Sequence, residues 1–407
     1  MTEAEPGSRR GLPLWPLLAT IAMQTLATMA AYSLPAAAPE IAADLGVEGT
    51  MVGVFISTVY GVGIVSAVLS PRFIRRFGAA RVGQFVMLVT LGMLAAVASG
   101  SLWAVGLGAV ILGCGYGATA PVATHLLVPR TPVGVLNLVL SIRQIGVPLG
   151  GVLAGMVVPP LTLAFGWQAA LMVQLVPAAL LAAALQVPRR RWDGDRDPAA
   201  ALVSAGLLDP LRLLATSPSV RNLSATCLVY AGIQLCFIAF MVVHLTGVGA
   251  AGLILAGQAL ATYQLSGVIS RPIWGWIADT WLPARWLLVL QGGIIALSAL
   301  AAATFDADWS FPAILLVCVI AGATASGFTG IAYGEFARLG GPQRTEATAI
   351  GSGAMFAGVM LLPSAFGLAV AFADYGLAYR SVAVVALAAA LLLALSPSRP
   401  LVAERVS

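Results

Sequence analysis

The chain of 407 residues is too apolar for a water-soluble protein of its length: apolar residues make up 60%, charged residues 9%, and the mean hydropathy is +0.96. A soluble domain needs about 25% charged residues to cover its surface, so soluble enzymes and nucleic-acid-binding proteins are excluded and a polytopic membrane protein is indicated. The net charge of +5 does not indicate a nucleic-acid partner, because the arginines are scattered between apolar runs.

Twelve apolar segments are long enough to cross a bilayer as helices, which takes about 20 residues each. The first is too long for a cleaved signal peptide and is interpreted as a retained span. A hydrophilic stretch in the middle predicts two bundles, residues 1–187 and 221–407, joined by a linker over 188–220. The predicted spans are 14–38, 49–70, 80–99, 103–126, 134–163, 167–186, 221–246, 251–277, 284–304, 310–335, 345–372 and 376–396.

The predicted linker is basic at its start and amphipathic from Leu202 to Leu214. Two interpretations of the amphipathic piece stay open. It either lies in the membrane interface as a helix or belongs to a flexible tether between the bundles.

The distribution of arginine predicts how the chain is oriented. If the amino terminus is cytoplasmic, nearly all loop arginines lie on that side and the outer loops hold only Arg380. Because basic loops stay in the cytoplasm, we expect a multi-pass protein of the inner (plasma) membrane with both termini cytoplasmic. The acidic residues expected on the outer face are Glu40, Asp44, Glu48, Asp306, Asp308 and Asp374.

Short matches at corresponding positions relate the two halves, as is typical of secondary transporters. One of them places His125, in the fourth span, opposite Glu335 in the tenth. The matches pair 117–119 with 327–329, 146–147 with 358–359, and 165–166 with 375–376.

The loop after the eighth span reads Gly275-Trp-Ile-Ala-Asp279. It resembles the Gly-x-x-x-Asp signature that major facilitator superfamily transporters carry after their second and eighth helices. After the second span, Pro71 and Arg75 stand where that signature has Gly and Asp. The Gly/Pro-rich segment 146–151 is similar to the signature of the fifth helix. The resemblance covers essentially the whole chain and implies an all-α fold of 12 transmembrane helices in two pseudo-symmetric six-helix bundles.

An acid where a helix leaves the membrane can cap the N-terminus of a neighbouring helix and pair with Arg. We expect Asp279, with Gly275, to form such a latch at the cytoplasmic side, whereas Arg75 replaces the acid of the first copy. His125 and Glu335 lie near cytoplasmic ends of spans and are predicted gating or coupling residues, since a partly buried His or Glu titrates near neutrality. A purely anchoring role for these two residues stays open.

Two arginines lie at mid-depth, one in each half. Arg143 lies about 16 Å along the fifth span from Pro132, and Arg271 about 12 Å in from Asp279. Such a charge costs about 3 kcal/mol or more and normally faces a cavity or a partner. The superfamily resemblance implies that the fifth and eighth helices are neighbours. We therefore predict an anion site, because guanidinium groups present a planar fork to carboxylates.

The segment Ser270-Arg271-Pro272-x-x-Gly275 resembles the eighth helix of monocarboxylate transporters, in which that Arg holds the substrate carboxylate. Those proteins carry an Asp one turn earlier, where this chain has Gly267. Alternatives stay open for both arginines. Arg271 pairs with Asp279 or a backbone carbonyl, or Arg143 pairs with an acid from another helix.

Polar residues at four-residue spacing mark one face of the first and seventh spans, which the resemblance places along the transport cavity. The alternative is that these side chains hold helices together. The predicted substrate contacts beside the two arginines are Gln24, Thr28 and Tyr32 in the first span and Thr226, Tyr230 and Gln234 in the seventh, with Gln144, Tyr60, Tyr263 and Gln264 as weaker candidates.

These features predict a secondary active transporter of a small organic anion, such as a monocarboxylate, that works by rocker-switch alternating access. Symport with protons stays open. The alternative within the fold is an efflux pump for amphipathic compounds or drugs, against which the two central cations argue. A membrane-embedded enzyme is disfavoured because reactive side chains do not cluster. No motif indicates a cofactor or metal. We expect a monomer whose partners are its substrate, membrane lipid and protons.

Overall fold

The computed structural model describes the chain except residues 1–11, 47–50, 201–208, 248–249, 251–252 and 398–407. The polar amino-terminal stretch and most of the predicted amphipathic piece therefore lie outside the described residues. Within the described ranges, every regular element is a helix.

The first bundle contains the helices that precede the linker. Its elements are α1 (Leu14–Ala36), α2 (Ala38–Leu45), α3 (Met51–Phe77), α4 (Ala79–Val97), α5 (Leu102–Tyr116), α6 (Thr119–Leu127), the 3₁₀ turns η1 (Val128–Arg130) and η2 (Val133–Val135), α7 (Leu136–Arg143), α8 (Gly146–Phe165), α9 (Trp167–Met172) and α10 (Leu175–Ala184).

The linker contributes two short helices, and the second bundle follows. These elements are α11 (Arg189–Trp192), α12 (Asp209–Thr216), α13 (Pro218–Gly247), α14 (Leu253–Thr280), α15 (Ala284–Ala302), α16 (Phe311–Ala321), the π-helix η3 (Gly322–Ser326), α17 (Thr329–Gly340), the 3₁₀ turn η4 (Gly341–Gln343), α18 (Arg344–Phe372) and α19 (Tyr375–Leu395).

Ten helical stretches among the described residues are long and apolar enough to cross a membrane. One of them, Phe311–Phe372, holds both the tenth and the eleventh predicted spans. Helix α14, which coincides with the eighth predicted span, is not among the ten; it carries Arg271 and Asp279. Sharp connections between spans fall at glycines with positive φ, such as Gly78 at 94° and Gly166 at 84°, where a side chain would be strained.

Several predicted spans are interrupted helices. The fourth divides into α5 and α6, the fifth into α7 and α8 immediately after Arg143, and the tenth passes through η3 between α16 and α17. At the first break a Cβ on Gly117 would lie 2.1 Å from the carbonyl oxygen of Gly63 on α3. Interruptions and π-helices inside spans free backbone groups to bind other partners.

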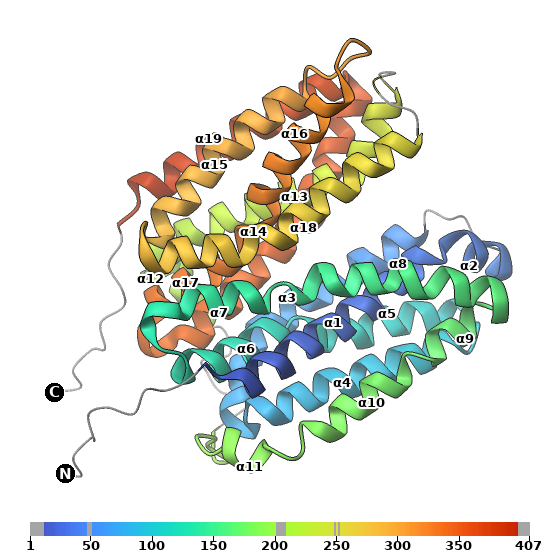
Figure 1. The fold of residues 1–407 in the computed structure, drawn as a ribbon. Coiled ribbons are helices and arrows are strands. Elements are labelled where there is room, and N and C mark those ends of the chain that lie inside the picture. The colour runs from blue at the N-terminus through green and yellow to red at the C-terminus, as the bar shows by residue number, and fades with distance from the viewer. Residues whose placement is uncertain (1–11, 47–50, 201–208, 248–249, 251–252, 398–407) are drawn as a thin grey trace.

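The apolar core consists of two clusters of buried residues: one lies in the first bundle, and the other combines the second bundle with residues of α1, α6 and α7. The bundles lie side by side in Figure 1, blue to green for the first and yellow to red for the second. The matched glycines Gly146 and Gly358 each allow two helices of their bundle to pack closely. A Cβ at Gly146 would lie 2.9 Å from the Ile21 carbonyl oxygen on α1, and one at Gly358 would lie 1.8 Å from the Leu228 carbonyl oxygen on α13. The absence of a side chain lets α8 and α18 pack closely on these helices.

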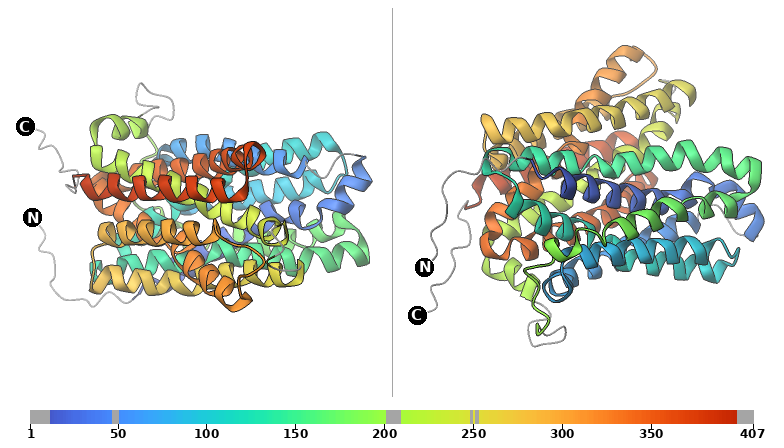
Figure 2. Two further views of the ribbon diagram at one scale, coloured as in Figure 1. Left: turned by 90° about the horizontal axis from the view of Figure 1, so that it is seen from above. Right: turned by 60° about the horizontal axis from the view of Figure 1, so that its bottom comes forward.

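The ribbons of the two bundles meet at one end of the molecule and separate toward the other (Figure 1). Helix α19 ends at the end where the bundles meet, as the two further views in Figure 2 also show. We call it the basic end because it carries Arg72, Arg75, Arg76, Arg81, Arg130, Arg285, Arg338 and Arg344.

Candidate substrate site and gate

Arg143 ends α7 and is buried, with 2% of its surface exposed. Its NH2 group donates to Gln24 Oε1 at 2.8 Å and to the Thr119 carbonyl oxygen at 3.0 Å, and NH1 donates to Gln144 Oε1. The Nε–H group has no partner among the described residues, although it is buried. The guanidinium is therefore positioned by neutral groups, and one of its donors is unsatisfied.

Arg271 lies on α14 and is equally buried, at 2% exposed. It donates through Nε to the Ser326 carbonyl oxygen at 3.0 Å, through NH2 to Ser326 Oγ at 3.1 Å, and through NH1 to the Gln144 carbonyl oxygen. Ser326 ends the π-helix η3, and Gln144 lies in the break between α7 and α8. The two arginines, one from each half, thus contact the same residue, Gln144.

Within the described ranges, neither central arginine has a carboxylate within 4 Å. Asp279 does not pair with Arg271, and no acid from another helix pairs with Arg143. Of the alternatives left open for Arg271, the contact with backbone carbonyls is the one observed.

The polar face of α1 continues outward from Arg143 as a hydrogen-bonded series. Gln24 donates through Nε2 to Thr28 Oγ1 at 3.0 Å, and the Thr28 hydroxyl shares a hydrogen bond of 3.2 Å with the Tyr116 hydroxyl. Further along α1, the hydroxyls of Tyr32 and Tyr60 lie 3.5 Å apart. The structure therefore brings the three predicted α1 residues together with Arg143 and with two tyrosines from α3 and α5.

Three aromatic rings close this series where the bundles meet. The ring centroid of Tyr60 lies 5.7 Å from that of Tyr116 and 5.2 Å from that of Phe356, and the Tyr116 and Phe356 centroids are 5.7 Å apart. Phe356 comes from α18 of the second bundle. The two tyrosines are almost completely buried, so the cluster joins the halves through apolar surface next to the polar series.

The corresponding face of α13 is used differently. Thr226 donates to the carbonyl oxygens of Asn222 and Ala389, and Tyr230 donates to the Leu288 carbonyl oxygen at 3.1 Å. These partners lie on α13, α19 and α15. Both side chains are therefore directed into their own bundle and are not brought to Arg271.

Gln234 and Tyr263 do approach the Arg271 site. Gln234 donates through Nε2 to Ser326 Oγ at 3.2 Å, and the Tyr263 hydroxyl donates to the Gln234 carbonyl oxygen at 3.4 Å. Ser326 thus links Arg271 to both. The departure at Gly267 also has a steric basis, because a Cβ there would lie 2.6 Å from Ser326 Cβ. Any side chain at position 267 would displace η3.

At the basic end, Asp279 caps α7 across the boundary between the halves. Its Oδ1 accepts from Asn137 N at 3.1 Å and Nδ2 at 2.8 Å, and Oδ2 accepts from Leu138 N at 2.8 Å. Gly275 permits this contact, since a Cβ there would lie 2.7 Å from the Asn137 carbonyl oxygen and the Leu138 Cα.

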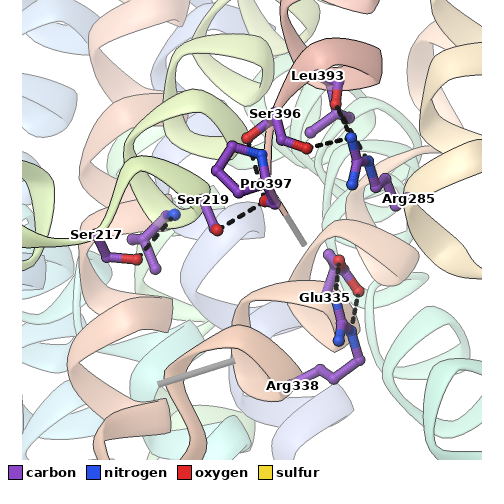
Figure 3. Close-up of polar contacts among 9 residues, drawn as sticks. Ser217, Ser219, Arg285, Glu335, Arg338, Leu393, Ser396 and Pro397 are labelled. Carbon is purple, nitrogen blue, oxygen red and sulfur yellow. Dashed lines mark hydrogen bonds and ion pairs between the residues drawn. The ribbon is translucent and has the colours of Figure 1, made fainter. Parts of the chain in front are cut away.

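Arg285, which follows this loop, does not pair with Asp279. Instead its side chain donates to the carbonyl oxygens of Leu393, Ala394 and Ser396 at the end of α19, as Figure 3 shows in part. The carbonyl groups that end a helix lack intrahelical partners and carry partial negative charge. Arg285 therefore stabilises the end of α19 within its own bundle.

The first-half counterpart of the latch holds less tightly. Arg75 NH2 lies 4.0 Å from Glu346 Oε1 in the first turn of α18, and the Arg75 side chain is 68% exposed. His125 adds a second connection, with Nε2 donating to Asp195 Oδ2 at 2.8 Å and Nδ1 at 3.2 Å from Thr345 Oγ1. His125 thus joins the first bundle to the linker and to α18.

Glu335 does not mirror His125 in its contacts. Its carboxylate accepts from Arg338 Nε at 2.7 Å and NH2 at 2.6 Å, one turn along the same helix (Figure 3). The matched positions therefore differ: His125 connects the halves, whereas Glu335 is paired inside its own bundle.

Sequence reasoning missed several of the groups that complete these sites. Tyr116 and Phe356 gave no periodic signal, and the contributions of Gln144 and Thr119 as backbone acceptors have no side-chain signature. The glycine matches 117–119 and 327–329 were the available clue, because they mark breaks in spans that bear on Arg143 and Arg271.

The comparisons with known proteins agree on one architecture. The family model described as Major Facilitator Superfamily matches residues 20–338. The proton:xylose symporter XylE, solved with 6-bromo-6-deoxy-D-glucose, matches with a TM-score of 0.73 at 14% identity over 93% of this chain and 94% of that one. The E. coli fucose:proton symporter FucP matches with a TM-score of 0.71 at 12% identity over 94% and 98%. The predicted fold class is confirmed.

One protein similar in sequence is a transporter whose name states its substrate. The 4-hydroxybenzoate transporter PcaK of Acinetobacter baylyi is 33% identical over 131 residues. The match covers 32% of this chain and 29% of that protein, so it spans less than a third of the relative's length.

Proposed function

Because the chain belongs to the major facilitator superfamily, we propose that it is a secondary transporter that carries a small organic anion, an aromatic monocarboxylate, by alternating access. Arg143 and Arg271 bind the carboxylate, and the α1 series together with the ring cluster contacts the body of the substrate.

The observation that carries the proposal is the pair of buried, acid-free guanidinium groups that both contact Gln144. Burial of a cation without a counter-charge is costly, and the cost is recovered when an anion binds. Each guanidinium has five N–H donors. Three protein acceptors take donors from each arginine, which leaves two donors on each for a ligand.

The aromatic body of the substrate is supported by Tyr60, Tyr116 and Phe356. Their rings lie at centroid distances typical of favourable aromatic pairs, and Gln24 and Thr28 connect them to Arg143. A planar acid with a ring beside its carboxylate matches this order of groups. The partial match to a 4-hydroxybenzoate transporter supports the same substrate class.

Alternating access is supported by the contacts at the basic end. The Asp279 cap and the His125–Thr345 contact join the halves there, and the ribbons separate toward the opposite end (Figure 1). With the basic end in the cytoplasm, as the arginine distribution favours, the structure is closed to the cytoplasm. The inward-facing state then requires both contacts to break.

Coupling to protons is part of the proposal and is assigned to His125. When the imidazole gains or loses a proton, its hydrogen bonds to Asp195 and Thr345 change, and so does the contact between the halves. Glu335 is the weaker candidate because Arg338 of the same helix already binds its carboxylate with two hydrogen bonds, so it makes no contact between the halves.

The test measures thermal unfolding of the purified protein with benzoate, 4-hydroxybenzoate, phosphate and lipophilic cations, and uptake of radiolabelled acid into proteoliposomes. A ligand that binds the folded state raises the melting temperature. We expect aromatic acids to stabilise the wild type, and Arg143→Gln and Arg271→Gln to abolish both stabilisation and uptake.

Arg380→Gln is the matched control, because it removes an arginine near the opposite end and should leave both readouts unchanged. Stabilisation by lipophilic cations alone would contradict the proposal and favour the drug-efflux alternative. Unchanged acid uptake in Arg143→Gln or Arg271→Gln would remove that residue from the site.

A further inference from the structure

An apolar groove of about 790 Å³ lies on the first bundle, and neither central arginine is among its lining residues. Its walls are α3 and α4, and its floor is formed at Cys114 on α5 and at Ala118, which follows it. The wall and floor side chains that define it best are Val65, Leu69, Phe73, Phe85, Leu88 and Cys114.

The groove opens toward the membrane rather than toward the transport route. Several of its wall residues are among the large exposed apolar side chains of the spans, with Val65 and Leu88 each 57% exposed. Cys114 is the exposed one of the four cysteines, whereas Cys227, Cys236 and Cys318 are buried. Inside a bilayer, this surface is in contact with lipid.

The length of the groove corresponds to one leaflet. Along α3 it runs from Val62 to Phe77, which is about 22 Å of helix. The predicted span ends at residue 70, so about 12 Å of this length lies in the hydrocarbon core, close to the ~15 Å of one leaflet, and the rest lies at the membrane surface of the basic end. One acyl chain of a lipid in the leaflet at the basic end has this reach.

The end of the groove at the membrane surface is positively charged. Arg81 lines it and donates NH1 to Gln84 Oε1, which leaves four of its five N–H groups for a ligand. Arg76 lies over the ring of Phe77, another wall residue, at 5.7 Å. The nearby acid, Asp193, is occupied by the N–H groups of Ala80 and Arg81 and by Arg189 at 3.8 Å.

We propose that this groove binds an anionic phospholipid, with one acyl chain between α3 and α4 and the phosphate at Arg81. The apolar walls provide affinity for the chain, and Arg81 with Arg76 provides the preference for negative charge. The site is separate from the proposed substrate site and does not depend on the identity of the transported molecule.

The experiment uses the full-length protein in nanodiscs that contain phosphatidylcholine or phosphatidylglycerol with a photoactivatable diazirine in one acyl chain. After irradiation, the adducts are mapped by mass spectrometry. We expect phosphatidylglycerol adducts concentrated in peptides of α3 and α4, and more of them than with phosphatidylcholine.

Two variants separate the contributions of the chain and of the charge. Leu88→Trp fills the groove and should reduce the adducts on α3 for both lipids, whereas Leu300→Trp, at an exposed position on α15, should not. Arg81→Gln should lower the ratio of phosphatidylglycerol to phosphatidylcholine adducts about five-fold, the effect of one basic side chain at a membrane surface. Arg380→Gln controls for loss of charge elsewhere.

Equal labelling by the two lipids, adducts spread evenly over the lipid-facing helices, or unchanged adducts in Leu88→Trp would each overturn the proposal. If Leu88→Trp does not elute as a folded protein, Val65→Trp fills the same groove from α3 and replaces it in the comparison.

Discussion

The faces of α1 and α13 occupy corresponding positions in the two halves and carry similar polar residues, yet they do different things. Gln24 and Thr28 on α1 connect Arg143 to the rings at the boundary between the bundles. Thr226 and Tyr230 on α13 bind carbonyl groups inside their own bundle. Corresponding positions in the two halves therefore do not give their polar faces the same partners.

The two sets of contacts that join the halves at the basic end, the Asp279 cap and the Arg75–Glu346 pair, also differ. Asp279 makes three hydrogen bonds to the start of α7, whereas the Arg75–Glu346 pair is long and largely exposed. The second bundle contributes the stronger latch and one guanidinium, and the first bundle contributes most of the proposed contacts with the substrate body. The two halves share a fold but contribute different parts of the gate and of the proposed substrate site.

The prediction with the largest expected effect concerns whether both halves need the planar guanidinium group of an arginine to bind the anion. Arg143→Lys and Arg271→Lys keep the charge but lose simultaneous bonds, for instance those of Arg271 to Ser326 and Gln144. Hydrogen bonds to charged groups are worth about 1.5–3 kcal/mol, so uptake of aromatic acid at low concentration should fall about 10- to 100-fold. Initial rates in proteoliposomes measure it. If Arg271→Lys alone kept the wild-type uptake rate, only Arg143 in the first half would need the planar guanidinium geometry.

The difference between the gates is tested by hydrogen–deuterium exchange. Asp279→Asn removes the charge that caps α7, at a cost of about 1 kcal/mol, and should speed amide exchange in the first turn of α7 several-fold. Arg75→Gln breaks an exposed pair worth at most about 1 kcal/mol and should leave exchange at the start of α18 nearly unchanged. The reverse order of these effects would show that the first-half gate is the stronger one.

The smallest effects compare the two polar faces directly through isosteric changes. Thr28→Val should raise the KM of uptake a few-fold, because it interrupts the series between Gln24 and Tyr116, and should also lower stability by about 1 kcal/mol through the two lost hydrogen bonds. Thr226→Val should lower stability by about 1 kcal/mol through the lost bonds to carbonyls and leave KM unchanged. Thermal unfolding and concentration-dependent uptake measure both. A KM effect of Thr226→Val would place α13 in the substrate site.

The sequence was sufficient for the features that depend on composition and local spacing. The helical character of the apolar segments and the cap that Asp279 forms on α7 follow from hydropathy and the character of helix termini, whereas the two-bundle division and the membrane depth of Arg143 and Arg271 stay predictions. The α1 face was predictable to the same degree as the α13 face, since both showed only a four-residue spacing. Nothing local distinguishes a polar face turned to the boundary between the bundles from one turned to a bundle core, because that orientation depends on packing against distant helices.

The partners of the central arginines were beyond the sequence for a second reason. Arg143 donates to the Thr119 carbonyl, and Arg271 to those of Gln144 and Ser326. Every residue has a carbonyl, so which ones are free depends on where the helices break. The position of η3 and of the break after Arg143 follows from close contacts between distant helices and not from the residues at the break alone.

The bond from Arg271 to the Gln144 main chain has a consequence for how this protein can change over generations. A side-chain acceptor is lost by one substitution, whereas a main-chain oxygen remains whichever amino acid occupies position 144. A substitution can therefore remove this hydrogen bond between the halves only by replacing Arg271. The side chain at position 144, whose Oε1 accepts from Arg143, can therefore change the surroundings of that arginine during evolution while the main-chain bond to Arg271 remains.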